Sequence, residues 1–309
     1  MDKEKREGRL GQVKVYVGKF FRIFKNEKDW KVIVFAVIVT LLLSLVLGDT
    51  MFLKKEGTRS GFFAIVSAGI WIGIFNSIQT VCREREIIKR EHRTGLHMSA
   101  YIAAHMIYQG LICIVQALLM VVIYGMFMKF PDKGLVTGSF YVDFYITLFL
   151  ILFSADMLGL AVSSFVKNTT AAMTVMPFIL IVQLIFSGSI FPITGNAKII
   201  SELTISRWGQ RALCIEANMN EIPSELLDSE IEMIQSIDGV EDLMDILPDK
   251  VTDKARESME KFLYEYTYRK IYDYKAELVY RRWGYLLIFA LAYALAAVIS
   301  LEFIDRDKR

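Results

Sequence analysis

Apolar residues in this chain gather into runs long enough to cross a lipid bilayer. A hydrocarbon core about 30 Å thick needs roughly 20 apolar residues in a helix, and a helix satisfies its own backbone hydrogen bonds in lipid. The sequence therefore predicts an all-α membrane protein with six transmembrane helices. They are placed at about 31–48, 61–81, 101–128, 144–166, 169–191 and 284–304.

An amphipathic segment precedes the first run, within residues 1–30. Apolar side chains recur there at helical spacing, and cations occupy the other face. This pattern predicts an interfacial elbow helix, with its apolar face in the acyl boundary and its cations among the headgroups. A helix packed against protein is the alternative. The apolar positions are Val13, Tyr16, Val17, Phe20, Phe21 and Phe24, and the cations are Lys14, Arg22 and Lys25.

The distribution of Lys and Arg predicts the orientation in the membrane. Ten fall within the first 31 residues and five within 82–100, against three within 49–60 and two within 129–142. Short cytoplasmic loops carry the excess of cations, whereas long loops are not counted. We therefore expect a multi-pass protein of the cell membrane with both termini in the cytoplasm.

The segment 192–283 is too long to be a simple connection between the fifth and sixth spans. Its first part is semi-apolar and could dip back into the membrane. The stretch Ala212–Glu260 then holds fourteen Asp and Glu against three Lys and Arg. We expect an external re-entrant segment followed by a mainly helical, acidic extracellular insert over 217–280. Residues 284–309 then supply the sixth span and a cytoplasmic tail, after spans one to five at 31–191.

A dense, mixed-sign stretch, EREIIKREHRTGLHMSAY (84–101), separates the second and third spans. Glu86 and Arg90 stand at i,i+4 spacing and support a helix. Ile87 and Ile88 add an apolar edge, which a docking helix needs and a solvated loop does not. The alternative is that these cations only fix the topology.

The same stretch resembles the loop between the second and third membrane helices of the G-subfamily type of ABC exporter. The matching positions are Glu84, Glu91, Gly95, Ser99 and Tyr101. FSGSIFPI (186–193) is similar to the end of the family's fifth helix. ISRWGQRALCIEAN (205–218) resembles its re-entrant external segment through Arg207, Gly209, Ala212 and Leu213. The elbow segment also fits, so the resemblance covers most of the chain outside the acidic insert.

The resemblance implies a membrane (permease) subunit of an ABC transporter, with a coupling helix at 82–98 that docks on the ATPase. Glu84 and Glu91 are two helical turns apart, and they could pair with basic groups on the ATPase or with Arg22 and Lys25 of the elbow. The residues assigned to coupling are Glu84, Ile87, Ile88, Glu91 and Gly95.

The sequence contains no G-x-x-x-x-G-K-[ST] motif, which is the loop that cradles nucleotide phosphates. We therefore expect ATP and Mg to be bound by a partner ATPase subunit, with no cofactor in this chain. The resemblance further implies a second permease copy or a paralogue, contact with membrane lipid, and no nucleic acid. Because eukaryotic members fuse the two parts, a separate permease indicates a bacterial system.

The family resemblance also implies a substrate cavity on a dimer axis between the second and fifth helices. Ile72 stands where multidrug members have an aromatic residue, which argues against planar drugs. The outer valve maps to Ser189 and Ile190. The residues assigned to the cavity are Trp71, Ile72, Phe75, Asn76, Asp156, Ile181, Gln183 and Phe186.

Asp156 is a carboxylate deep within a predicted span. Such a group costs several kcal/mol unless it is paired or faces water, and it is a functional candidate by default. A structural hydrogen bond to Gln116 or Gln183 is the alternative. In the second span, Gly69 and Gly73 form a G-x-x-x-G that favours close helix packing.

These observations favour a non-enzymatic permease of an ATP-driven exporter that moves a lipid, peptide or amphipathic small molecule out of the cytoplasm or inner leaflet. The alternative is a non-transporting sensor or immunity module on the same scaffold. A membrane enzyme ranks third, because the spans hold no convergent histidine and carboxylate cluster. Cys82, Cys113 and Cys214 are far apart, so neither a disulfide framework nor a metal site is expected.

Overall fold

A computed structural model describes residues 8–48, 50–189, 191, 193–224, 258, 261 and 268–303. Within these ranges the chain is helical and contains no strand. Most of the predicted acidic insert, the valve residue Ile190 and the end of the tail lie outside the described residues. The helices in chain order are α1 (Arg9–Asn26), α2 (Lys31–Leu47), α3 (Lys55–Ser77), α4 (Thr80–Arg83), α5 (Arg85–Arg93), α6 (Met98–Phe127), α7 (Phe140–Phe165), α8 (Thr169–Ile185), α9 (Ala197–Glu202), α10 (Ile205–Glu216) and α14 (Ala276–Glu302), with the 3₁₀ turn η1 (Lys270–Tyr272) before the last helix.

Four of these helical segments are long and apolar enough to cross a membrane: Lys55–Arg83, α6, α7 and α14. α1 and α2 form a fifth candidate span if the two helices are counted as one segment. The chain bends by 68° between them. The other two predicted spans correspond to α2 and α8, of 17 residues each. At 1.5 Å per residue such a helix is about 25 Å long, which is the lower limit for a span. The predicted fifth run is shortened because α8 ends at Ile185, before the turn at Gly188 (φ +81°).

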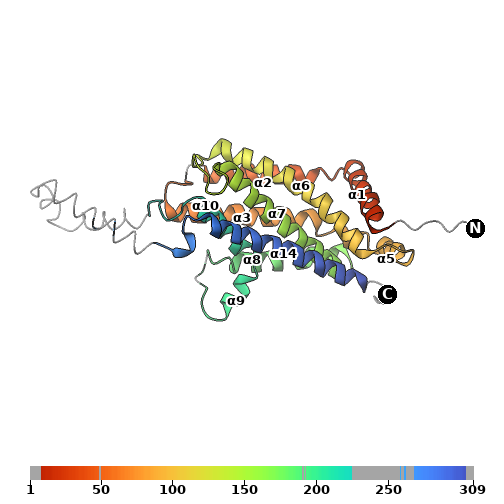
Figure 1. The fold of residues 1–309 in the computed structure, drawn as a ribbon. Helices are drawn as coiled ribbons and strands as arrows, with labels where there is room; N and C mark the ends of the chain where they lie inside the picture. The colour runs from red at the N-terminus through yellow and green to blue at the C-terminus, as the bar shows by residue number, and fades with distance from the viewer. Residues whose placement is uncertain are drawn as a thin grey trace, which may run out of the picture.

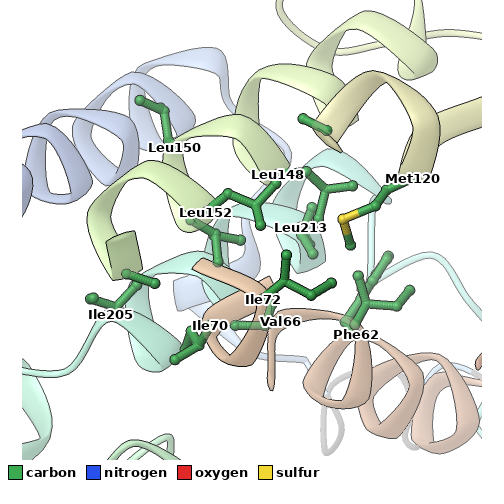
Figure 2. Packing of buried hydrophobic residues seen from close by; sticks show 14 of the residues in the cluster. Phe62, Val66, Ile70, Ile72, Met120, Leu148, Leu150, Leu152, Ile205 and Leu213 are labelled. Carbon is green, nitrogen blue, oxygen red and sulfur yellow. The ribbon is translucent and has the colours of Figure 1, made fainter. Parts of the chain in front are cut away.

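The core of the bundle forms around α7, which packs against α3, α6, α8, α10 and α14. Figure 2 shows the inward side chains of α3, among them Ile72, facing Leu148 and Leu152 of α7 and Leu213 of α10. Because lipid is as apolar as these side chains, the core within the membrane is held chiefly by close van der Waals packing.

Glycines allow α3 and α7 to approach closely. A Cβ atom built on Gly73 would meet the carbonyl oxygen of Leu152 and would lie 2.8 Å from the Cβ atom of Ala155. On the other helix, a Cβ atom on Gly159 would lie 2.8 Å from the carbonyl oxygen of Ile74. The predicted G-x-x-x-G is therefore a packing motif within the chain, and its partner is α7.

Three helices keep an exposed apolar stripe that a membrane would cover. On α14 the stripe includes Leu287, Leu291 and Leu295, which follow each other at four-residue spacing. On α6, Leu111 and Leu118 are exposed in the same way, and α2 has a similar face. A helix that is apolar all round but buried on one side only is typical of the outer layer of a membrane bundle.

The apolar face of α1 packs on α6. Phe20 is buried, and its ring centroid lies 4.0 Å from that of His105 and 5.8 Å from that of Tyr101. This part of the surface predicted for the acyl boundary is therefore a protein contact, in line with the alternative interpretation. Val15 and Phe21 of α1 remain exposed.

The two ends of the bundle differ in what they carry. α1, α5 and the C-terminal end of α14 lie at one end, and α10 and η1 lie at the other (Figure 1). His92 Nε2 of α5 is 4.0 Å from Glu302 Oε2 at the end of α14. At the opposite end, the carboxylate of Asp143 closes the loop before α7 by accepting hydrogen bonds from the backbone N–H groups of Val136 (2.8 Å) and Thr137 (2.9 Å).

Candidate functional site

The charged stretch after α3 is helical, and its last turn is fixed by a glycine. Glu84 joins α4 to α5, and its carbonyl accepts the N–H groups of Ile87 (2.9 Å) and Ile88 (3.0 Å). Gly95 has φ +110°, a left-handed conformation that glycine adopts without strain. The N–H of Leu96 then bonds back to the carbonyl of Glu91 (3.0 Å), which closes the helix end.

Side chains of α1 hold both carboxylates of this stretch. Lys19 Nζ lies 3.0 Å from Glu84 Oε2 and 4.0 Å from Glu91 Oε1. The Tyr16 hydroxyl donates to Glu91 Oε2 at 2.7 Å. Burial, reinforced by this hydrogen bond and the charge of Glu91, raises the pKa of Tyr16. The phenol therefore stays protonated and remains a donor at physiological pH.

The expectation that Arg22 and Lys25 would pair with these carboxylates is wrong. Both residues are exposed and form no ion pair with Glu84 or Glu91, and the Arg22 Nε donates to the carbonyl of Gly18 at 3.1 Å. Lys19 is the partner because it is three residues from Tyr16, on the side of α1 that faces α5. A second contact comes from Gln12, which donates to the carbonyl of Gly95 (3.1 Å) and accepts the N–H of His97 (3.0 Å).

The two isoleucines of α5 have different environments. Ile88 is fully buried in a cluster with Phe20, Leu96 and Tyr101. Ile87 is 41% exposed. The predicted apolar edge is therefore one anchoring residue and one exposed residue, and only Ile87 is open to a partner protein.

The other side of α5 is fastened to the end of α7. Arg85 Nη1 donates to the carbonyls of Ser164 (2.9 Å) and Val166 (3.1 Å). The hydroxyl of Ser163 accepts the N–H groups of Val81 and Cys82, both at 3.1 Å. A force on α5 would thus reach the helix at the centre of the bundle directly.

A polar network crosses the middle of the bundle and includes Asp156. Asn76 Nδ2 lies 3.5 Å from Asp156 Oδ2, and the Cys113 thiol lies 3.5 Å from the same oxygen. Asn76 and Gln116 exchange two hydrogen bonds of 2.8 and 3.1 Å. The second oxygen, Oδ1, is buried without a hydrogen-bond partner. Gln116 therefore reaches Asp156 only through Asn76, and Gln183 lies in a different cluster.

A cavity of about 230 Å³ opens between α1, the α1–α2 turn, α3, α4 and α6. We call it the elbow cavity. Its lining combines aromatic rings, amides and charged groups, and it touches both the coupling stretch and the polar network. The lining residues are Phe20, Ile23, Asp29, Val32, Phe75, Asn76, Gln79, Thr80, Arg83, Glu84, Tyr101, His105, Tyr108, Gln109 and Ile112.

Residues 12–215 match the family model described as ABC-2 type transporter. This range includes α2 to α9 and all but the outer ends of α1 and α10. The chain belongs to the ABC-2 type transporter family. It is a multi-pass membrane protein and a permease component of an ABC transporter.

A relative supports the assignment. The permease is 30% identical over 147 residues to an ABC transporter ATP-binding/permease protein of Mycobacterium tuberculosis. The match covers 45% of this chain and 16% of the relative. The likeness is therefore to one part of a much longer protein.

Among the residues assigned to a substrate cavity, Asn76 and Asp156 meet in the polar network, whereas the others do not gather around one cavity within one copy of the permease. Trp71 of α3 and Ile181 of α8 are exposed, at 42% and 50%. Ile72 is fully buried and faces the core of the bundle (Figure 2), so it does not belong to the same open face. Phe75 is partly buried, with its ring centroid 5.4 Å from that of Phe35 of α2.

Three further residues assigned to the cavity and valve hold the end of α8 against α10 and the residue before it. They are Gln183, Phe186 and Ser189. Gln183 is buried, and its Oε1 accepts the N–H of Ser206 at 3.2 Å. The carbonyl of Phe186 accepts the hydroxyl of Thr204 at 3.4 Å. Ser189 donates its hydroxyl to Gln210 of α10. These contacts join α8 to α10, so the three residues have a structural role within one copy of the permease.

Sequence reasoning missed another buried carboxylate, Glu216 at the end of α10. It is 1% exposed, and its Oε1 accepts the hydroxyl of Thr147 of α7. That hydroxyl in turn accepts the indole N–H of Trp283 of α14 at 2.6 Å. Glu216 Oε2 has no hydrogen-bond partner. Its apolar neighbours in the sequence gave no signal, because the burial comes from three helices that are distant along the chain.

We expect Glu216→Gln to raise the melting temperature of the permease at pH 7 and to leave it unchanged near pH 4. Burial raises the pKa of Glu216 well above its ordinary value. The folded state therefore keeps the proton where the unfolded chain has lost it, and stability falls as the pH rises above about 4.3. Glutamine keeps the acceptor for Thr147 and has no charge to lose. Each kcal/mol regained corresponds to about 2–4 °C.

The measurement is thermal unfolding in detergent at both pH values. Glu202→Gln is the control, because Glu202 has a half-exposed side chain on α9. An equal gain at pH 4 and pH 7 would contradict the assignment of the effect to this proton.

The described residues contain no group of three or more His, Cys, Asp or Glu that could hold a metal ion. The three cysteines are free and buried. Cys214 is fully buried and Cys82 is 5% exposed, so labelling of the topology requires introduced cysteines, for instance at the exposed Asp132 and Lys167.

Proposed function

We propose that this permease is the membrane subunit of an ATP-driven exporter and that α5 is its coupling helix. The observation that carries the proposal is the set of contacts that fix α5 to α1 and α7. Lys19, Tyr16 and Gln12 hold one side of it, Arg85 fastens it to α7, and Ile87 is left exposed. A helix that only marked the topology would not need contacts to two other helices.

The proposed topology has six spans with both termini in the cytoplasm. α2 and α8 serve as short spans, and α1 is the elbow in front of the first. The elbow and α5 then lie on the cytoplasmic side, where an ATPase subunit carrying ATP and Mg could reach them. The lysine and arginine excess of the N-terminal segment and the 82–100 loop supports this orientation.

Closure of the ATPase subunits on ATP would push α5 and, through Arg85, the end of α7. The bundle would shift between inward-facing and outward-facing states, and its ligand would move because its affinity for the two states differs. The chain itself would make and break no covalent bond.

The proposed substrate is a lipid, a peptide or an amphipathic small molecule taken from the cytoplasm or the inner leaflet. A second permease copy or a paralogue would complete the cavity. The exposed side chains of Trp71 and Ile181 support this, because they lie on neighbouring helices and find no partner in the core of one copy.

The test is purification of the tagged permease from its own membranes in mild detergent, followed by reconstitution into lipid vesicles. We expect an ATP-hydrolysing subunit to co-purify in a fixed ratio, and vesicles to move a fluorescent lipid or peptide only with ATP. A permease that purifies without any ATPase activity, or whose vesicles move no probe in either direction, would contradict the proposal.

A further inference from the structure

The elbow cavity has the composition of a binding site for a cation attached to a membrane lipid. We propose that it binds the primary-ammonium headgroup of an inner-leaflet aminophospholipid. The inner-leaflet placing rests on the proposed orientation, but the proposal does not depend on transport, because it concerns binding by the permease alone.

The position of the cavity fits a lipid headgroup. One wall is α1, whose outer face combines the exposed apolar residues Val15 and Phe21 with the cations Lys14 and Arg22. Such a face is typical of a helix at the headgroup level of a bilayer. A headgroup beside α1 would therefore enter the cavity without leaving the membrane surface.

Aromatic rings form much of the inner wall. Phe20 is held between His105 (4.0 Å between centroids), Tyr101 (5.8 Å) and Tyr108 (5.7 Å). Phe75 contributes a further ring from α3. Ring faces attract cations electrostatically, so an aromatic wall favours an ammonium group over an anion.

The charges at the rim leave one carboxylate for a ligand. Glu84 is paired with Lys19 at 3.0 Å, and Arg83 is paired with Glu27 at 3.1 Å. In the described part of the chain, no Lys or Arg nitrogen lies within the 4.0 Å ion-pair distance of Asp29. Burial raises the pKa of Asp29, against the charge of Arg83. A cation from outside the chain would supply the ion-pair partner that the Asp29 carboxylate lacks.

Polar atoms behind the cavity wall lack partners. His105 is 3% exposed, and neither of its ring nitrogens has a hydrogen bond. The hydroxyl of Tyr101, which is fully buried, has none either. Buried polar groups without partners are costly, but these atoms have almost no accessible surface, so they lie out of reach of a ligand in the cavity. The carboxylate of Asp29 is the acceptor for a headgroup, whose ammonium group has three N–H donors.

The size and the mouth select a zwitterionic headgroup over a larger ligand. The volume of about 230 Å³ lies below the range of about 300–1,000 Å³ that drug-sized ligands occupy. Arg83 is half-exposed, as is its partner Glu27, so their ion pair is weak. Arg83 can therefore turn to the lipid phosphate, which guanidinium groups bind well.

The experiment compares two lysophospholipids with the same acyl chain. The full chain is titrated in detergent with lysophosphatidylethanolamine and with lysophosphatidylglycerol, and bound lipid is counted by native mass spectrometry. We expect the ethanolamine lipid to bind at least about tenfold more tightly, because only it carries the ammonium group. Equal affinities in the wild-type protein would overturn the proposal without any variant.

Two variants locate the site. Asp29→Asn removes the charge that faces the ammonium group, and Phe75→Leu removes the ring that α3 contributes to the cavity wall. Each is expected to lose most of the tenfold preference. Asp132→Asn, at an exposed position outside the cavity, is expected to keep it. Full preference in both cavity variants would place the lipid elsewhere and overturn the proposal.

A final competition experiment distinguishes a free headgroup from a headgroup attached to a lipid. Free phosphoethanolamine is added in competition with the bound lysophosphatidylethanolamine. Competition supports a site that recognises the headgroup alone. Absence of competition, with the lipid preference intact, supports a site that takes the headgroup only from a lipid in the membrane.

Discussion

Reversing the charge of Lys19 is expected to abolish the stimulation of ATP hydrolysis by substrate, and reversing Glu84 in the same chain is expected to restore it. Lys19 Nζ is 3.0 Å from Glu84 Oε2 and 4.0 Å from Glu91 Oε1. Lys19→Glu would place three carboxylates together at the junction of α1 and α5. The side chains of Lys19 and Glu84 are 29% and 16% exposed, so the pair is only partly screened. A charged hydrogen bond of this kind contributes about 1.5–3 kcal/mol.

The measurement is ATP hydrolysis and transport by the reconstituted complex for Lys19→Glu, Glu84→Lys and the double variant. Lys14→Glu is the matched control, because Lys14 is exposed on α1. Wild-type stimulation in Lys19→Glu would show that the contact between α1 and α5 is not needed for coupling. A double variant as inactive as the single ones would show that the charges act separately.

Replacing Ile88 by Ala is expected to destabilise the permease by about 2–5 kcal/mol, whereas Ile87→Ala is expected to spare the fold and weaken ATPase docking. Ile88 is fully buried beneath α5, and Ile87 is 41% exposed. Removal of an exposed methyl-rich side chain usually changes stability by less than about 0.5 kcal/mol. An apolar residue at the centre of an interface can cost about 2 kcal/mol or more of binding when it is truncated.

Thermal unfolding of the permease and co-purification of the ATPase test the two variants side by side. The two residues are adjacent and chemically identical, so each is the control for the other. Equal losses of stability in both variants would contradict the observed burial. Full ATPase recovery with Ile87→Ala would show that the partner docks elsewhere.

The helices could be predicted from the sequence because lipid imposes a simple rule. An apolar run must become a helix, and α3, α6, α7 and α14 follow it. The ends of the short helices could not be predicted in this way. α8 stops at Ile185 although the apolar run continues, because Ser187 and Gly188 turn the chain toward α10.

The contacts of the site were less predictable than its helices. The pattern at 84–95 indicated a docking helix, yet it could not choose between Ile87 and Ile88, because both fit an apolar edge. The choice of Lys19 over Arg22 as the partner of Glu84 depends on how α1 rotates when Phe20 packs on His105. Nothing in the sequence marked Glu216 as a buried residue, because its burial depends on how the helices of the bundle assemble.

The close approach of α3 and α7 limits how the permease can change shape. With only a glycine hydrogen between the backbones at Gly73 and Gly159, a slide of one helix along the other would drive a larger side chain into a carbonyl group. The two helices therefore travel as a rigid body. Hinges that move this pair as a unit would lie at its borders, and α8, which packs against both helices and is fastened to α10 through Gln183, forms one such border.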